Sequence, residues 1–173
     1  PLSYAGLNLP DEWPAGVGDG VVQASVADLE LGVGHHVDRV EHLDADVVVV
    51  VVGTPVDEHL NPDPNAVLDL FKDLSEFFHP GQLVILRSTV FPGVTRKVED
   101  WFASKHPGVS VSFCPERIAE GSALEEIMTL PQLVGARSAD ISQRAEAFFG
   151  AVGIKTIRVD PEEAELAKLF TNS

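Results

Sequence analysis

A run of six consecutive valines, Val47 to Val52, constrains the fold of this chain more than any other feature. β-Branched residues favour extended backbone, and a strand without polar alternation is buried on both of its faces. Gly53 ends the run and Asp46 precedes it, so its apolar length is far below the roughly 18 residues of a membrane-spanning helix. The run therefore predicts a central strand of a sheet and no membrane span.

The sequence after Asp46 alternates between apolar runs of strand length and segments with helical periodicity. This order is typical of an α/β fold, in which parallel strands are joined by crossover helices. Besides the valine run, strands are expected at 82–87, 109–114, 132–136 and 155–159. Helices are expected at 66–78, 96–104 and 138–153, with a cap at Ser138 or Asp140, and from Pro161 to the end of the chain.

The first 45 residues are rich in Gly and Pro, and one run with partial alternation, 21–31, predicts either an edge strand or irregular structure. We therefore expect three parts: an irregular or edge segment at 1–45, an α/β domain at 46–160, and the start of a helix at 161–173. Because that last helix has no C-cap, we expect the natural polypeptide to continue.

The formal net charge is −15, from 27 acidic and 12 basic residues. Such a field repels phosphate backbones and anionic lipid headgroups, so nucleic acid and membrane partners are not expected. A nucleotide remains possible as a ligand, because backbone N–H groups at a helix N-terminus bind phosphate locally. No secretory signal is recognisable, so we expect a cytoplasmic protein. No metal site is expected, since the clustered histidines lack ligand spacing: His35, His36, His42 and His59.

Five segments follow one another in a specific order: GTPVDE at 53–58, RSTVFPGVT at 87–95, CPERIAEGSA at 114–123, LPQLVGA at 130–136 and EAELAKLFTN at 163–172. In this order and spacing, they resemble the UDP-sugar 6-dehydrogenase family, over about two thirds of the chain. The form CPER is more similar to the UDP-N-acetylmannosamine dehydrogenase branch than to the UDP-glucose branch. The resemblance implies NAD as cofactor, a UDP-sugar as substrate, and oxidation of the sugar C6 alcohol to a carboxylate in polysaccharide biosynthesis.

Both GTPVDE and RSTVFPGVT lie at the ends of predicted strands, and ligands of open α/β sheets bind at the carboxyl ends of the strands. The resemblance implies cofactor contacts at Val52, Gly53, Thr54, Pro55, Val56, Ser88, Thr89 and Val90. The alternative is that both segments are ordinary turns, in which Pro55 fixes φ and the hydroxyls cap the next helix.

Four further residues are implied to be catalytic: Glu116, Glu120, Lys168 and Asn172. Paired carboxylates at a sheet edge can act as acid or base when burial raises one pKa, and Glu120 is also implied to contact the cofactor. Lys168 and Asn172 lie four residues apart on one helix face and are implied to stabilise charge on oxygen and to orient the hydrolytic water. The alternatives are a solvated acidic loop and an ordinary helix surface.

The chain departs from the resemblance in its cofactor loop and its nucleophile. A dinucleotide fold opens with Gly-x-Gly-x-x-Gly between a strand and a helix, but the segments at 16–21 and 32–37 lack the third glycine. We therefore expect an incomplete three-layer, Rossmann-like parallel sheet, whose first βαβ half with the glycine loop is absent or replaced. The resemblance implies a cysteine thiolate that forms a thioester, which water then hydrolyses, at a position well beyond Lys168. Cys114 does not match that position and is interpreted as a small buried hydrophobic residue.

Three functions remain open on the sequence. In the first, the chain is a fragment of such a dehydrogenase and is inactive in isolation. In the second, it is a non-catalytic module for binding or for self-association into a homo-oligomer. The third is another Rossmann-type NAD dehydrogenase, against which PERIAEG and EAELAKLFTN argue together.

Overall fold

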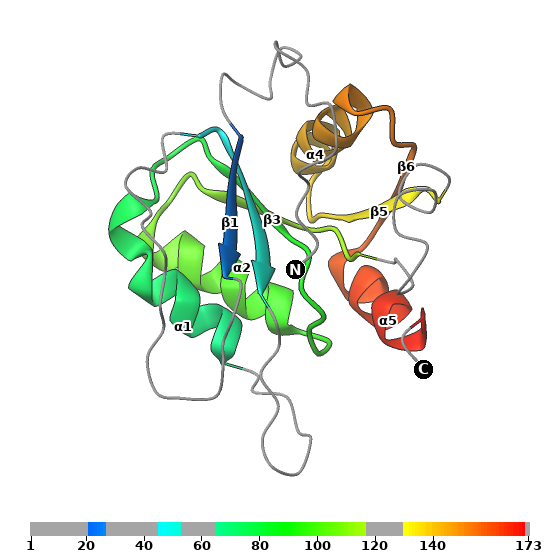
Figure 1. Cartoon of the computed structure of the whole chain (residues 1–173). Coiled ribbons are helices and arrows are strands. Elements are labelled where there is room, and N and C mark those ends of the chain that lie inside the picture. The colour runs from blue at the N-terminus through cyan, green and yellow to red at the C-terminus, as the bar shows by residue number, and fades with distance from the viewer. Residues whose placement is uncertain (1–20, 27–44, 53–64, 117–129, 172–173) are drawn as a thin grey trace.

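The computed structural model describes residues 21–26, 45–52, 65–116 and 130–171. These form one six-stranded sheet with strands in sequence order across it (Figure 1). The strands are β1 (Val21–Val26), β2 (Val47–Val52), β3 (Leu83–Leu86), β4 (Ser110–Phe113), β5 (Gln132–Gly135) and β6 (Thr156–Val159). β1 is at the edge of the sheet and falls inside the run at 21–31 where an edge strand was one of the two expectations.

The strands run in two directions. β1 to β4 are mutually parallel, as predicted, whereas β5 is antiparallel to β4 and β6 is parallel to β5. β4 and β5 meet at a single pair, Phe113 opposite Gly135. The predicted α/β class is confirmed, and the sheet is mixed rather than parallel throughout.

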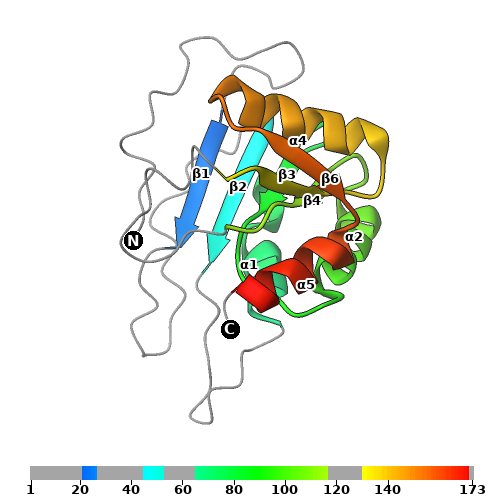
Figure 2. The ribbon, with the colours of Figure 1, turned by 90° about the vertical axis from the view of Figure 1, so that its right-hand side faces the viewer.

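The helices lie on both faces of the sheet, which gives the predicted three layers (Figures 1 and 2). They are α1 (Ala66–Asp73), the short 3₁₀ helix η1 (Ser75–Phe77), α2 (Val94–Lys105), α4 (Ala139–Ala151) and α5 (Pro161–Thr171). The predicted helix at 66–78 is thus divided at Leu74 into α1 and η1. The Ser138 cap of α4 is confirmed, since its Oγ accepts a hydrogen bond from the Ile141 N–H at 3.2 Å. No helix in the described ranges is long and apolar enough to cross a membrane.

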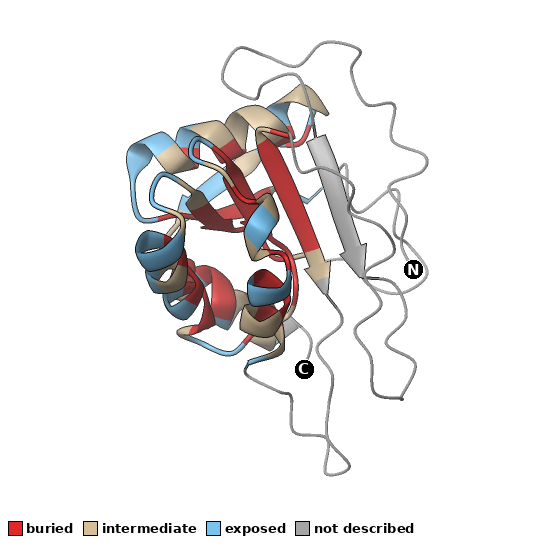
Figure 3. Cartoon of the chain, turned by 90° about the vertical axis from the view of Figure 1, so that its left-hand side faces the viewer, coloured by how far each residue is buried: buried red, intermediate tan, exposed pale blue. Residues whose placement is uncertain are grey.

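Alternate residues of β2 pack against opposite helical layers. Val48 and Val50 join the core cluster that includes α1 and α2, whereas Val47 and Val49 join the cluster that includes α4. All four are at most 4% exposed. Figure 3 shows β2 as a buried strand within the sheet. The predicted central strand is therefore confirmed, and the absence of polar alternation is explained by two apolar layers.

An aromatic cluster joins α1 to α2. The ring of Phe102 lies 5.0 Å from the ring of Phe71 and 4.9 Å from that of Phe78, both edge to face. Trp101 packs against the rings of Phe71 and Phe102, and the His106 Nε2 shares a hydrogen bond with the Ser75 hydroxyl at 2.8 Å. Edge-to-face packing of this kind adds to the stabilisation from buried area. These contacts hold one helical layer together beneath β2 and β3.

Close contact between β5 and α5 determines the position of α5 on the sheet. A Cβ at Gly135 would lie 2.9 Å from the Pro161 Cα and 3.1 Å from the Ala164 Cβ. Only a residue without a side chain fits this separation, so glycine here allows α5 to lie directly on β5. α5 also contacts β4.

Candidate functional site

The carboxyl ends of β2, β3 and β4 lie at one edge of the sheet. Val50, Leu86 and Phe113 are in register across the three strands. The segments that follow β3 and β4 also remain adjacent, because the Cys114 N–H donates to the Leu86 carbonyl at 2.8 Å and the Glu116 N–H to the Arg87 carbonyl at 3.5 Å. This edge is where the sequence places its candidate residues.

The buried side chain of Arg87 stabilises this edge through hydrogen bonds. The Arg87 Nη1 donates to the Gln132 Oε1 at 3.0 Å, and the Gln132 Nε2 donates to the Pro115 carbonyl at 2.9 Å. The Arg87 guanidinium also lies 5.5 Å from the ring centre of Phe149, a cation–π contact. The chain from β4 to Glu116 is therefore held by β5 and by the end of β3. Sequence reasoning missed both Arg87 and Gln132, although each lies in an otherwise apolar run, where a polar residue signals a buried partner.

Lys168 on α5 is brought to the same edge and is only 7% exposed. Burial lowers the pKa of its amine, the Glu116 carboxylate opposes this by raising it, and the Arg87 guanidinium lowers it further. The Glu116 carboxylate and the Arg87 guanidinium therefore lie within electrostatic range of the Lys168 amine. Two of the predicted catalytic residues, Glu116 and Lys168, are thus brought together by the fold.

The predicted cofactor segment after β3 is mostly buried. Ser88 is 3% exposed, Thr89 is partly exposed, and Val90 is 5% exposed. Val90 is a member of the core cluster beneath α1 and α2. Its side chain therefore serves the core, and its role as a cofactor contact stays a prediction, as do those of Ser88 and Thr89.

Glu165, one turn before Lys168, is a buried carboxylate that sequence reasoning did not single out. It is 0% exposed, and its two oxygens accept hydrogen bonds from the N–H groups of Gly93 at 2.7 Å and Thr95 at 2.8 Å. Those donors are at the N-terminus of α2. The available sequence signal was the acid three residues before the lysine, which places both on one helix face.

Several predicted positions lie outside the described residues: Gly53, Thr54, Pro55, Val56, Glu120 and Asn172, together with His35, His36, His42 and His59. Val52 is described as the last residue of β2. Cys114 is fully buried, as predicted, and burial raises the pKa of its thiol to about 11. Within the ranges that the structure describes, no group of three or more potential metal ligands occurs.

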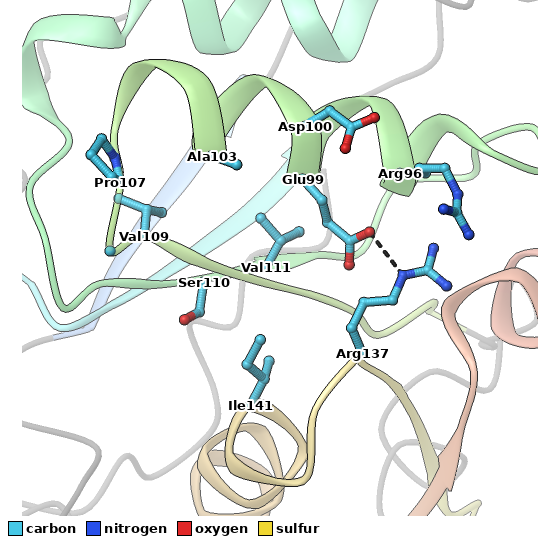
Figure 4. Close-up of a pocket in the computed structure, with 11 residues that line it drawn as sticks. Arg96, Glu99, Asp100, Ala103, Pro107, Val109, Ser110, Val111, Arg137 and Ile141 are labelled. Atoms are coloured by element: carbon cyan, nitrogen blue, oxygen red, sulfur yellow. Dashed lines mark hydrogen bonds and ion pairs between the residues drawn. The ribbon is translucent and has the colours of Figure 1, made fainter.

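A separate cavity of about 540 Å³ lies between α2, β4 and α4 (Figure 4). It is lined by the start of β4 and by charged side chains, among which the Arg137 Nε donates to the Glu99 carboxylate at 3.0 Å. Burial raises the pKa of Glu99, and Arg137 opposes this. None of the predicted site residues lines this cavity, so it is distinct from the edge that carries Glu116 and Lys168.

Comparisons with known proteins match most of the chain. Residues 18–169 match the model of the UDP-glucose/GDP-mannose dehydrogenase family, NAD binding domain. An NDP-N-acetyl-D-galactosaminuronic acid dehydrogenase of Ralstonia nicotianae is 27% identical over 142 residues, which cover 75% of this chain and 34% of the relative. A UDP-N-acetyl-D-mannosamine dehydrogenase of Methanococcus aeolicus is 28% identical over 146 residues, which cover 81% of this chain and 33% of the relative.

Solved structures show the same fold. A UDP-glucose dehydrogenase from Pyrobaculum islandicum superposes with a TM-score of 0.65 and 29% identity, covering 74% of this chain and 31% of that chain. A UDP-D-ManNAc dehydrogenase from Pyrococcus horikoshii gives a TM-score of 0.68 at 24% identity, covering 75% of this chain and 32% of that chain. The chain thus spans about a third of the length of the relatives it matches.

Proposed function

Because the chain belongs to the UDP-glucose/GDP-mannose dehydrogenase family, we propose that it is the cofactor-side part of an NAD-dependent UDP-sugar 6-dehydrogenase. The substrate class we propose is a UDP-N-acetylated sugar, as in the UDP-N-acetyl-D-mannosamine dehydrogenases among its relatives. The observation that supports this best is that the Glu116 N–H donates to the carbonyl of Arg87, directly before Ser88 and Thr89, with the buried Lys168 within electrostatic range of the Glu116 carboxylate.

The chemistry of this edge fits NAD. Ser88 and Thr89 supply hydroxyls directly after β3, and β2 ends beside β3 in a parallel sheet, which is where dinucleotides bind in open α/β sheets. Among the residues that the structure describes, we propose Val52, Ser88 and Thr89 as contacts of NAD. When bound, NAD supplies a hydride acceptor for the alcohol carbon.

Lys168 is suited to stabilise negative charge that develops on a substrate oxygen. Its amine is buried, and a charge acts more strongly where water is excluded. Its lowered pKa also makes proton release easier than from an exposed lysine. The nearby Glu116 carboxylate opposes that lowering of the Lys168 pKa.

Glu116 is suited to accept a proton or to orient water at the same place. It is half-buried, its backbone N–H donates to the Arg87 carbonyl, and Gln132 donates to the preceding carbonyl of Pro115, so the backbone that carries Glu116 is held at the strand ends. General acid–base catalysis requires first that the acid or base lies within hydrogen-bond reach of the reacting group, and only then a suitable pKa. We propose Glu120 and Asn172 as its partners in orienting the hydrolytic water.

We propose that the isolated chain does not turn over. Oxidation to a carboxylate through a covalent intermediate needs a thiolate, and Cys114 is fully buried with a raised pKa of about 11. The chain also spans only a third of its relatives. Incubation with NAD and UDP-N-acetylmannosamine should therefore give no NADH absorbance, and measurable turnover would contradict the proposal.

Binding tests the proposed site itself. NAD and UDP-N-acetylmannosamine would each be titrated into the chain and followed by ligand-detected NMR and calorimetry. We expect weak binding of at least one of them, and we expect Lys168→Met to weaken binding of the sugar nucleotide. The matched control is Lys97→Met, because Lys97 is an exposed lysine on α2. This substitution should leave the affinity for both ligands unchanged. If neither ligand binds the unaltered chain, the alternative of a binding or self-association module unrelated to the reaction is favoured.

A further inference from the structure

The N-terminus of α2 is capped by a residue of α5. Gly93, the N-cap of α2, has φ 92° and offers no side chain, and no cap forms within its own segment. The first N–H groups of a helix lack partners inside the helix and carry partial positive charge. Here the Glu165 carboxylate accepts two of them, from Gly93 at 2.7 Å and from Thr95 at 2.8 Å. Both oxygens of this fully buried carboxylate are thereby hydrogen-bonded.

The capped glycine ends the segment that holds the candidate cofactor residues. Ser88 and Thr89 directly follow β3, and a turn closed by the Val94 N–H and the Phe91 carbonyl at 3.1 Å leads into α2. Glu165 therefore holds one end of this segment, while β3 holds the other. The positions of the two hydroxyls depend on both attachments.

The same helix face carries Lys168. Residues three apart on a helix are neighbours on its surface, and both Glu165 and Lys168 are buried, whereas Leu166 and Phe170 on the other face are exposed. The contact of α5 with Gly135 fixes the start of the helix, and the Glu165 hydrogen bonds fix its rotation one turn before the lysine.

A local cap would have stabilised α2 without joining it to α5. Ser138 caps α4 in that way, with its own hydroxyl and the N–H three residues later. At α2 the carboxylate comes from a helix seventy residues further along the chain, so the interaction also fixes the distance between two elements.

We propose that Glu165 is a positioning residue for the proposed reaction: its carboxylate locks the face of α5 that carries Lys168 to the segment that carries Ser88 and Thr89. The amine and the hydroxyls then keep a fixed separation before any ligand binds. This inference rests on the proposed function for its purpose, but its geometric content can be tested without NAD or substrate.

The test measures the pKa of the Lys168 amine by NMR in the full chain, in Glu165→Gln and in Glu165→Asp. The aspartate keeps the charge but is one methylene too short to reach both N–H groups. If Glu165 positions the helix, Lys168 gains water in both variants and its pKa rises toward the ordinary lysine value. Loss of a nearby negative charge alone would lower it in the glutamine variant, so the sign separates the two effects.

Glu162→Gln is the matched control. Glu162 is also an acid of α5 that binds α2, through Arg96 at 3.1 Å, but it makes these contacts at the surface. We expect it to leave the pKa of Lys168 unchanged. An unchanged or lowered pKa in either Glu165 variant would overturn the inference, and so would failure of both variants to fold, because the carboxylate would then be a folding determinant. Absence of NAD or UDP-sugar binding by the unaltered chain would instead overturn the proposed function.

Discussion

The carboxylate of Glu116, just beyond β4, raises the pKa of Lys168 on α5 against the burial that lowers it. The two residues come from different segments, and α5 contacts both β5 and β4. Burial of a charged lysine is energetically unfavourable, and a nearby carboxylate reduces this penalty. A buried lysine with a carboxylate nearby is typical of a functional site.

Replacement of Lys168 by methionine should leave the chain as stable as before or more stable, by about 1 kcal/mol. The pKa of Lys168 is lowered in the folded chain, so the unfolded chain binds the proton more tightly and the charged amine disfavours folding at neutral pH. Stability of the unaltered chain should accordingly rise as the pH increases from the folded pKa toward the unfolded value of 10.5. Urea unfolding of both proteins at pH 7 and at higher pH measures this. A clear loss of stability in Lys168→Met at pH 7 would show that the lysine is a structural residue.

Gly135→Ala should destabilise the chain by about 1–3 kcal/mol, because the added methyl group overlaps with the backbone of α5. The nearest atoms are the Pro161 Cα at 2.9 Å and the Ala164 Cβ at 3.1 Å, and backbone cannot move aside as a flexible side chain can. Thermal or urea unfolding gives the difference. Gly150→Ala in α4 is the control, since nothing lies within 4 Å of its added Cβ. Alanine there should stabilise the helix by about 0.5–1 kcal/mol, and equal effects at both glycines would contradict the close packing of α5 on β5.

Stability should fall as the pH is lowered from about 4.5 to about 2, in part through Glu162. Hydrogen bonds from Arg137, at 2.7 Å for the Nη1, lower the pKa of Glu162 from 4.5 to about 2. A carboxylate with a lowered folded pKa stabilises the chain above its unfolded pKa and loses this effect as the pH falls through the folded value. Glu162→Gln should therefore flatten the acid limb of the stability curve, most clearly at low salt because the pair is partly exposed.

Glu76→Gln provides the comparison for the acid series. Glu76 is exposed in η1, and in the described part of the chain it forms no ion pair. Its replacement should not change the slope of stability against pH below 4.5. An equal flattening in both variants would mean that Glu162 and Arg137 do not stabilise the fold.

The sequence was most informative where one residue type repeats or a local rule applies. The valine run predicted β2 as a central strand, and its two apolar layers confirm the reason given. Ser138 predicted the start of α4 through its own cap. These features depend on neighbours in the sequence, so a single sequence contains the information.

The sequence did not reveal features that depend on distant contacts. The reversal of β5 and β6 relative to β4 leaves no mark in their composition, since strands of either direction have the same alternation. Arg87 and Glu165 were missed because their partners, Gln132 and the N-terminus of α2, are far away in the sequence. Glu116 and Lys168 were found through their resemblance to a known motif, and spacing alone favoured an ordinary loop and helix surface.

The most direct test of the site is the pKa of the Lys168 amine, measured by NMR in the unaltered chain and in Glu116→Gln, with Glu76→Gln as control. If the two side chains share one site at the strand ends, the unaltered amine titrates below 10.5, and removal of the Glu116 charge lowers its pKa further while the control leaves it unchanged. An ordinary lysine pKa that does not respond to Glu116→Gln would contradict the site described here.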